Sequence, residues 1–243
     1  MKKIIAMLLA LTMVLALAAC GGDPKETTPG NDPIQQTTPV ENQGNDPVET
    51  EPQVQNPTKE ELTVEYLKSL PETPVEDFEV GRGSDGVGYC ILAYVGDSDV
   101  VVIPAEIEGR PVTELAKGVF DNDSAVRGVL IPESVKEIGE LFVNSTAVEL
   151  VVAEGLEVVG YGAFTNSSVR EVKLGDNVLA MDVTAFGACG KLEKVYIPAS
   201  LTDMTSDEVR MAFSACKNLT IYGEAGSFIE GVANELGIPF VAE

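Results

Sequence analysis

Residues 191–198, Lys-Leu-Glu-Lys-Val-Tyr-Ile-Pro, contain the pattern that decides the fold of this chain. A short apolar strand ends there in Pro198, and similar short strands recur at five other places. The strands begin at residues 101, 129, 150, 172, 195 and 219, so successive copies are 21 to 28 residues apart. One short strand per copy, at a period of 20 to 30 residues, is typical of a solenoid.

Two further apolar features recur with each of the five full copies. The first is a pair of apolar residues three positions apart: Val112/Leu115, Val135/Ile138, Leu156/Val159, Val178/Met181 and Leu201/Met204. The second is a single Phe: Phe120, Phe142, Phe164, Phe186 and Phe213. One copy cannot bury this set alone, but stacked copies can. We therefore predict a repeat solenoid over residues 101–222, with one short parallel strand per repeat and the Phe residues buried in neighbouring coils.

The outward face of the predicted sheet is the best candidate for a binding surface. When the six short strands are aligned on their starting residues, the middle outward residues are Val102, Leu130, Val151, Lys173, Tyr196 and Thr220. Strict alternation predicts polar residues on a solvated face, whereas the first three are apolar. Either the N-terminal helix or hairpin covers them, or they belong to a partner site. The candidate contacts are Tyr196 and Lys173, followed by Val151 and Leu130, because Tyr is enriched at interfaces.

The pattern V-x-I-P-x-x-[LV]-x-x-[IL], followed by F-x-x-C-x-x-L, resembles the bacterial BspA-like leucine-rich repeats. The entry segment 101–113 and the exit segment 219–240 also resemble the first repeat and the ending of that family. The resemblance covers residues 75–243 and departs where Ala153 and Gly175 replace Pro. It implies a leucine-rich-repeat-like right-handed coil without catalytic residues. It also implies a surface or secreted protein of a host-associated bacterium, in some cases one that adheres to host proteins.

Residues 1–20 predict export and a lipid anchor. Two lysines precede a mostly apolar run of 14 residues, which is shorter than the roughly 20 residues of a membrane-spanning helix. The run ends in Leu17-Ala18-Ala19-Cys20, which resembles the bacterial lipobox, where the Cys is lipidated and becomes the mature N-terminus. The alternative is an ordinary secretory signal that happens to end near a Cys. We expect lipidation of Cys20 and an extracytoplasmic, membrane-anchored lipoprotein of a Gram-positive bacterium.

Three further segments complete the predicted organisation. Residues 21–57 hold seven of the 14 prolines and no aromatic residue, a composition that predicts a disordered linker. Residues 58–100 are predicted to form an N-terminal cap, with a helix over 59–69 that begins at a capping box on Thr58. Residues 223–243 are predicted to form a C-terminal cap.

Two local patterns within the caps have definite interpretations. The segment 81–86 reads G-x-G-x-x-G, but a strand follows it instead of the helix that a dinucleotide site requires. It therefore predicts a hairpin turn between strands at 78–80 and 89–94. In the C-terminal cap, Ser227 and Glu230 predict a capping box that opens a helix, and Gly237 predicts its end.

Composition excludes several kinds of chemistry. The chain has no His, 16 Lys+Arg and 39 Asp+Glu, and therefore a formal net charge of −23. It lacks a His-based triad or His metal ligand, and its acidity argues against a nucleic-acid partner. The pairs Asp97/Asp99 and Asp121/Asp123 do not fit a calcium loop, so we read them as solvated surface. No motif indicates an enzyme, a metal site or a cofactor.

Cys189 and Cys216 each follow a Phe by three residues and so occupy equivalent places on adjacent coils. Strands about 4.8 Å apart would permit a disulfide between them. Cys is also a common small apolar residue of protein interiors, and repeat position already explains both residues. We favour buried free thiols.

These features predict a cell-surface lipoprotein that presents its repeats for protein binding or adhesion. The anchor makes the membrane one partner, and a host extracellular or basic protein is the expected other. A substrate-binding lipoprotein of a transporter is an alternative, although that class needs two α/β lobes around a cleft. A structural protein of the cell envelope is another.

Overall fold

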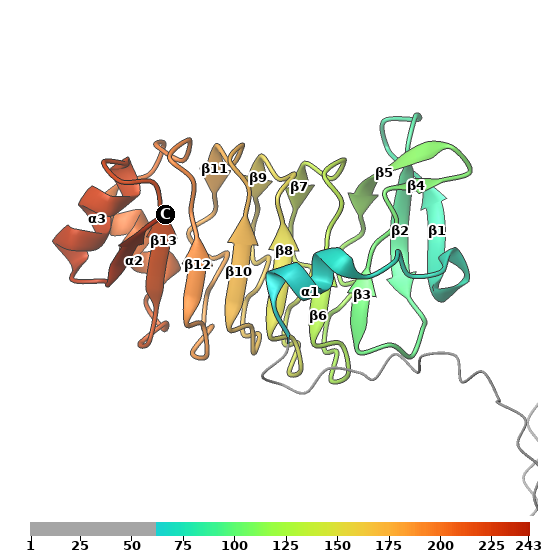
Figure 1. The fold of residues 1–243 in the computed structure, drawn as a ribbon, viewed down its shortest axis with the longest axis horizontal. Helices are drawn as coiled ribbons and strands as arrows, with labels where there is room; N and C mark the ends of the chain where they lie inside the picture. Colours follow the sequence, from blue (N-terminus) through green and yellow to red (C-terminus); the bar gives the residue numbers. More distant parts are fainter. Residues whose placement is uncertain (1–61) are drawn as a thin grey trace, which may run out of the picture. The chain divides into compact units, whose positions relative to one another are not determined.

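The computed structural model describes residues 62–243, and its main element is a seven-stranded parallel sheet (Figure 1). The strand order is β14-β13-β12-β10-β8-β6-β3. The strands are β3 (Val100–Val102), β6 (Gly128–Leu130), β8 (Leu150–Ala153), β10 (Glu171–Leu174), β12 (Lys194–Tyr196), β13 (Thr220–Gly223) and β14 (Phe240–Ala242). Each repeat of the sequence thus contributes one strand, and each strand pairs with that of the next repeat, as predicted.

In three of the five repeats, the second residue of the apolar pair lies in a strand of a smaller parallel sheet behind the first. It consists of β7 (Glu137–Ile138), β9 (Val158–Val159) and β11 (Ala180–Met181). One side chain from each of these strands enters the core: Ile138, Val159 and Met181. The inward residues of the larger sheet, such as Val129, Val172 and Val195, enter the same core from the other side.

The Phe residues form a continuous stack through that core. The ring centroids of Phe120, Phe142, Phe164, Phe186 and Phe213 are 5.0 to 5.2 Å apart from one to the next. All five side chains are buried. The prediction of one buried Phe per coil is confirmed.

Two small units flank the repeats. At the N-terminal end are helix α1 (Val64–Ser69), the 3-10 turn η1 (Val75–Asp77) and a four-stranded sheet of order β1-β2-β5-β4. Its strands are β1 (Phe78–Arg82), β2 (Tyr89–Tyr94), β5 (Arg110–Leu115) and β4 (Glu106–Ile107). At the C-terminal end are helices α2 (Ser206–Ala212) and α3 (Phe228–Leu236).

The helix boundaries differ in detail from the prediction. Within the described residues α1 begins at Val64, where the Thr63 side chain caps it by accepting from the backbone N–H of Tyr66; Thr58 lies outside them. Ser227 and Gly237 bound α3 as predicted. The Glu230 side chain, however, accepts from the N–H of Gly226 at 2.6 Å rather than from that of Ser227.

The glycine-rich turn joins two antiparallel strands, β1 and β2, which confirms a hairpin and not a dinucleotide loop. Asp85 closes the turn, since its Oδ1 accepts from the N–H groups of Val87 and Gly88 at 2.8 and 2.9 Å. These two bonds hold the pKa of the Asp85 carboxyl below its usual value. Gly86 has a φ of 70°, which glycine adopts without strain.

The predicted strand register is wrong in two copies. Val172 pairs with Val151 and Lys173 with Val152, so Val151 faces the core and Val152 faces outward. In the last copy Tyr196 pairs with Tyr222, and Thr220 pairs with Lys194. The shift of one residue in β8 moves every side chain of that strand to the opposite face of the sheet. The shift of two residues in β13 keeps each side chain on its face but changes its neighbours on β12.

Cys90, Cys189 and Cys216 are buried free thiols in the described chain, as we favoured for the last two. The Cys189 Sγ donates to the carbonyl of Phe164 at 2.9 Å. Burial raises the pKa of the Cys189 thiol and raises that of Cys216 to about 12. Both residues therefore act as small core residues beside the Phe stack.

Candidate binding surface

The outward face of the seven-stranded sheet has an apolar half and a polar half. Its two outward rows run across successive strands. The first is Val100, Gly128, Leu150, Glu171, Lys194 and Thr220. The second is Val102, Leu130, Val152, Lys173, Tyr196 and Tyr222. In both rows the change from apolar to polar falls between β8 and β10.

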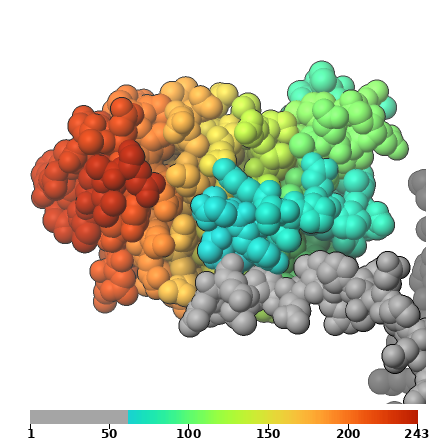
Figure 2. Space-filling view, viewed as in Figure 1, coloured from blue at the N-terminus to red at the C-terminus, as the bar shows by residue number. Residues whose placement is uncertain are grey.

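Helix α1 covers the apolar half. Its Leu67 is fully buried against Val100, Leu150 and Val152, and Leu130 packs at the margin of the same cluster. Figures 1 and 2 show the helix lying across this part of the sheet and leaving the strands nearer the C-terminal end open. Of the two explanations for the apolar face, cover by the N-terminal segment is therefore the correct one.

The backbone of the sheet makes room for this helix at Gly128. A Cβ there would lie 3.0 Å from the Leu62 Cδ1 atom and 3.1 Å from the Leu67 Cδ2 atom. The absence of a side chain therefore allows α1 to approach β6 closely.

Polar contacts hold α1 and the segment after it in place. Lys68 forms an ion pair with Glu154 at 2.6 Å. Thr73 exchanges two hydrogen bonds with Val102: its N–H donates to the carbonyl, and its hydroxyl accepts from the N–H. Glu72 accepts from the N–H of Ala105. These contacts place the cover over one end of the sheet and not over the other.

Of the four predicted contact residues, one is consequently unavailable to a partner and a second is partly covered. Val151 lies in the main core with no exposed surface, because the register of β8 differs by one residue from the predicted one. Leu130 does face outward but packs against the cluster beneath α1. The interpretation of Val151 as a partner-binding residue was therefore wrong, and Leu130 lies in the covered half of the face.

The other two, Lys173 and Tyr196, lie together on the open half, and the structure adds Tyr222 to them. Lys173 Nζ is 3.9 Å from the centroid of the Tyr196 ring. The Tyr196 and Tyr222 rings stack with centroids 4.9 Å apart. Glu243 Oε2 lies 4.0 Å from Lys173 Nζ. We call Lys173, Tyr196, Tyr222 and Glu243 the tyrosine face.

Carboxylates surround the tyrosine face. Burial, together with the negative charges of Glu171 and Glu243, raises the pKa of Tyr196 to about 12. Lys194 forms an ion pair with Glu171 at 3.3 Å. The phenol of Tyr196 therefore stays protonated and neutral throughout the physiological range.

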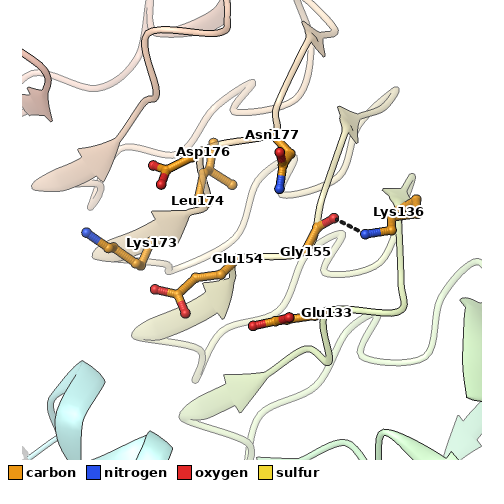
Figure 3. A pocket seen from close by; sticks show the side chains of 9 residues that line it. Glu133, Lys136, Glu154, Gly155, Lys173, Leu174, Asp176 and Asn177 are labelled. Atoms are coloured by element: carbon orange, nitrogen blue, oxygen red, sulfur yellow. Dashed lines mark hydrogen bonds between the residues drawn. The ribbon is translucent and has the colours of Figure 1, made fainter.

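Two shallow hollows adjoin the tyrosine face, and Lys173 lines both. The first, of about 350 Å³, contains both tyrosine rings together with Asp176, Glu224 and Glu243. The second, of about 400 Å³, contains Glu133, Glu154 and Asp176 (Figure 3). In it Lys136 donates to the carbonyl of Gly155 at 3.2 Å. The ammonium of Lys173 thus lies between two acidic hollows.

Of the four aspartates that we read as solvated surface, Asp97 is exposed, whereas the other three have structural roles. Asp121 Oδ1 accepts from the N–H of Val143, and Asp123 Oδ1 accepts from those of Ala125 and Val126. Asp99 forms an ion pair with Arg127. Within residues 62–243 no cluster of three His, Cys, Asp or Glu side chains could hold a metal ion. None of the helices in that same stretch is long and apolar enough to cross a membrane.

Comparison with known proteins supports the repeat pattern. A family model described as the BspA type leucine rich repeat region matches residues 105–222 in six copies. Residues 105–222 belong to the BspA-type leucine-rich repeat family. The matched segment lies within the predicted repeat segment of 101–222, and it includes Lys173, Tyr196 and Tyr222.

Among solved structures, a leucine-rich repeat protein of T. pallidum is similar to this chain. The two are 21% identical, with a TM-score of 0.43, over 71% of this chain and 100% of that one. No curated protein sequence matches the chain significantly.

Of the tyrosine face, the sequence interpretation missed Tyr222 and Glu243. The sequence alignment placed Thr220 beside Tyr196, but helix α2 lengthens the preceding repeat. Strand β13 therefore pairs two residues later in the sequence than expected, with Tyr222 beside Tyr196. The Thr205-x-x-Glu208 capping box of α2 was the available signal for that insertion. Glu243 follows β14 and approaches Lys173 only through the pairing of strands.

Proposed function

We propose that this protein is a bacterial cell-surface lipoprotein that uses its repeats to bind or adhere to another protein. Its repeats would form a right-handed leucine-rich-repeat solenoid with 58–100 and 223–243 as terminal caps. The observation that carries the proposal is the contiguous row Lys173, Tyr196 and Tyr222 on the uncovered half of the sheet. Sheet faces of repeat proteins join side chains from successive coils into one extended surface.

The anchor belongs to the same proposal. Cys20 and the linker 21–57 lie outside the described residues, and their roles rest on the sequence. Two acyl chains on Cys20 would hold the protein stably at the membrane, where one chain gives only marginal binding. Cys20→Ala should move the protein from the membrane fraction to the medium, or leave it with its leader uncleaved. Unchanged retention with normal trimming would contradict the anchor.

The binding role is tested by capture of host extracellular proteins on purified protein, followed by comparison of variants. Tyr196→Ala should weaken a captured partner by at least about 1–2 kcal/mol, because a central aromatic contributes most to an interface. Lys173→Glu should strengthen a basic partner and weaken an acidic one. Tyr161→Ala is the matched control, since Tyr161 is 63% exposed and lies outside the tyrosine face.

Unchanged binding by both Tyr196→Ala and Lys173→Glu would remove the site from this face. Absence of any partner would remove the adhesion role. Residues 62–243 do not form the two α/β lobes of a transporter-type binding protein, because their core is built from stacked repeats. The repeats therefore favour the binding module over that alternative.

A further inference from the structure

We infer that the tyrosine face binds a cationic side chain of the partner, above all an arginine, on the ring of Tyr196. In the free protein the ammonium of Lys173 occupies that position on the ring. The inference rests on the proposed function and names the chemistry of its partner. It is carried by the position of a cation that is already present on the Tyr196 ring.

The aromatic part of the site is preorganised. Tyr196 lies on β12, between β10 with Lys173 and β13 with Tyr222. Its ring stacks on that of Tyr222 at 4.9 Å, and the pair is half-buried, so the two rings lose little further freedom when a ligand binds. The face of a tyrosine ring attracts a cation through its quadrupole.

Lys173 is held weakly enough to be exchanged. Its ammonium makes one cation–π contact at 3.9 Å and one ion pair at 4.0 Å, the long limit for such a pair. Its side chain is 29% exposed. Solvent still reaches both Lys173 and Glu243 and weakens these contacts, so a better-matched cation can take the place of the ammonium.

The second hollow offers Lys173 an alternative position. Glu133, Glu154 and Asp176 line it together with Lys136, and Lys173 already forms part of its wall (Figure 3). Of these carboxylates, Glu154 also pairs with Lys68. A rotation of the Lys173 side chain away from Tyr196 would keep its charge near these carboxylates. Displacement of Lys173 therefore does not leave its ammonium without acidic neighbours.

Charge selects the occupant. Asp176, Glu224 and Glu243 line the hollow that contains both rings, and the chain as a whole carries a formal charge of −23. A guanidinium is planar, stacks on aromatic faces and pairs with carboxylates through two parallel bonds. An ammonium can do only part of this. Arginine is accordingly the side chain that matches the rings and the acids together.

The test uses the full chain and three synthetic peptides, acetyl-Gly-X-Gly-X-Gly-amide with X as arginine, lysine or citrulline. Citrulline has nearly the shape of arginine but no charge. Binding is followed by NMR, through the ring signals of Tyr196 and Tyr222. We expect saturable binding of the arginine peptide, weaker binding of the lysine peptide and at least a tenfold loss with citrulline.

Two pairs of variants distinguish displacement of Lys173 by the peptide from general electrostatic attraction between the peptide and the acidic protein. Lys173→Gln removes the resident cation and should tighten the arginine peptide about threefold or more, even though the protein becomes more negative by only one charge. Lys217→Gln makes the same change of charge at an exposed site elsewhere and should have little effect. Tyr196→Leu should weaken the arginine peptide at least tenfold, and Tyr161→Leu should not.

Equal binding of the arginine and citrulline peptides would overturn the inference, as would equal effects of Lys173→Gln and Lys217→Gln. If a captured partner still depends on Tyr196 in that case, the proposed function stands and only the cation site fails. If neither the partner nor the arginine peptide depends on Tyr196, both fail.

Discussion

At the residue scale, one turn in each of four repeats requires a left-handed backbone. Asn122, Asn144 and Asn166 follow their Phe by two residues and have φ values of 57°, 58° and 56°. Ala188 occupies the equivalent place with a φ of 59°. Asn enters this region more readily than other residues with a side chain. The Asn166 side-chain amide also donates to Asn144 Oδ1 of the neighbouring repeat at 2.6 Å. Ala has no such compensation, so Ala188 is strained.

Relief of this strain should stabilise the protein. Ala188→Gly should raise the free energy of unfolding by about 0.5–1 kcal/mol, because glycine adopts a positive φ without steric penalty. Ala180→Gly, at an exposed position of β11 with a negative φ, should lower it by a similar amount. Urea denaturation measures both. A loss of stability in both variants would show that position 188 is not strained.

The buried thiols give a second prediction at this scale. Only a thiolate reacts readily with iodoacetamide, and burial raises the pKa of Cys216 to about 12. Cys216 should therefore remain unmodified at pH 8 in the folded protein and react rapidly in urea, as mass spectrometry of peptides would show. Fast labelling without urea would mean that this part of the core opens.

The raised pKa of Cys216 also makes the stability of the fold depend on pH in a defined direction. A thiol whose pKa is higher in the folded state stabilises the fold fully below its unfolded pKa of about 8.5. That contribution is lost as the pH rises from there towards about 12.

At the element scale, strand β8 explains why the outward face changes character. All four of its residues are buried: Val151 and Ala153 in the main core, and Leu150 and Val152 beneath α1. A strand buried on both faces has a continuous apolar sequence, from which alternation cannot be read. The predicted register failed at β8 for this reason.

Charges at the strand entrances support the observed register. The residues that immediately precede successive strands alternate in sign: Asp99, Arg127, Glu149, Arg170 and Glu193. Arg127 contacts both Asp99 and Glu149, and Arg170 forms a paired contact with Glu193. If one strand shifted its register, these charged residues would lie beside apolar residues of the next strand. The alternating charges therefore favour a single alignment of the repeats.

The cover formed by α1 can be tested separately from the repeats. Leu67→Asp should detach the helix, because a buried carboxylate without a partner is strongly unfavourable. Hydrogen exchange should then increase at Val102, whose N–H donates to Thr73, while the amides of β10 and β12 stay protected. Met211→Asp, at a 58% exposed position of α2, is the control. Loss of protection throughout the sheet would mean that the repeats depend on α1.

At the scale of the whole molecule, the Phe stack joins the repeats into one unit. Phe164 lies at its middle, with ring centroids 5.2 Å from Phe142 and 5.0 Å from Phe186. Phe164→Ala should lower the free energy of unfolding by about 3–5 kcal/mol, because it leaves a cavity in the core. Tyr161→Ala, an exposed aromatic nearby in the chain, should change it by no more than about 0.5 kcal/mol.

The same substitution should also uncouple the two ends of the array, because each coil contacts only its neighbours. Hydrogen exchange during urea unfolding should show β6 and β13 losing protection at different urea concentrations in Phe164→Ala and together in the wild type. A single transition in the variant would contradict nearest-neighbour coupling through Phe164.

The sequence by itself determined the repeats, their period and the Phe stack, because each of these is a local pattern that recurs. It favoured buried thiols at Cys189 and Cys216 but left a disulfide open, which the structure excludes. It also determined the acidic character and half of the candidate surface, Lys173 and Tyr196. The tertiary structure alone decided which part of the sheet is open. That depends on α1 folding back over β6 and β8, and on strand pairing that brings Tyr222 and Glu243 to Lys173 and Tyr196. Contacts between distant segments leave no periodic trace, so they cannot be read from a pattern.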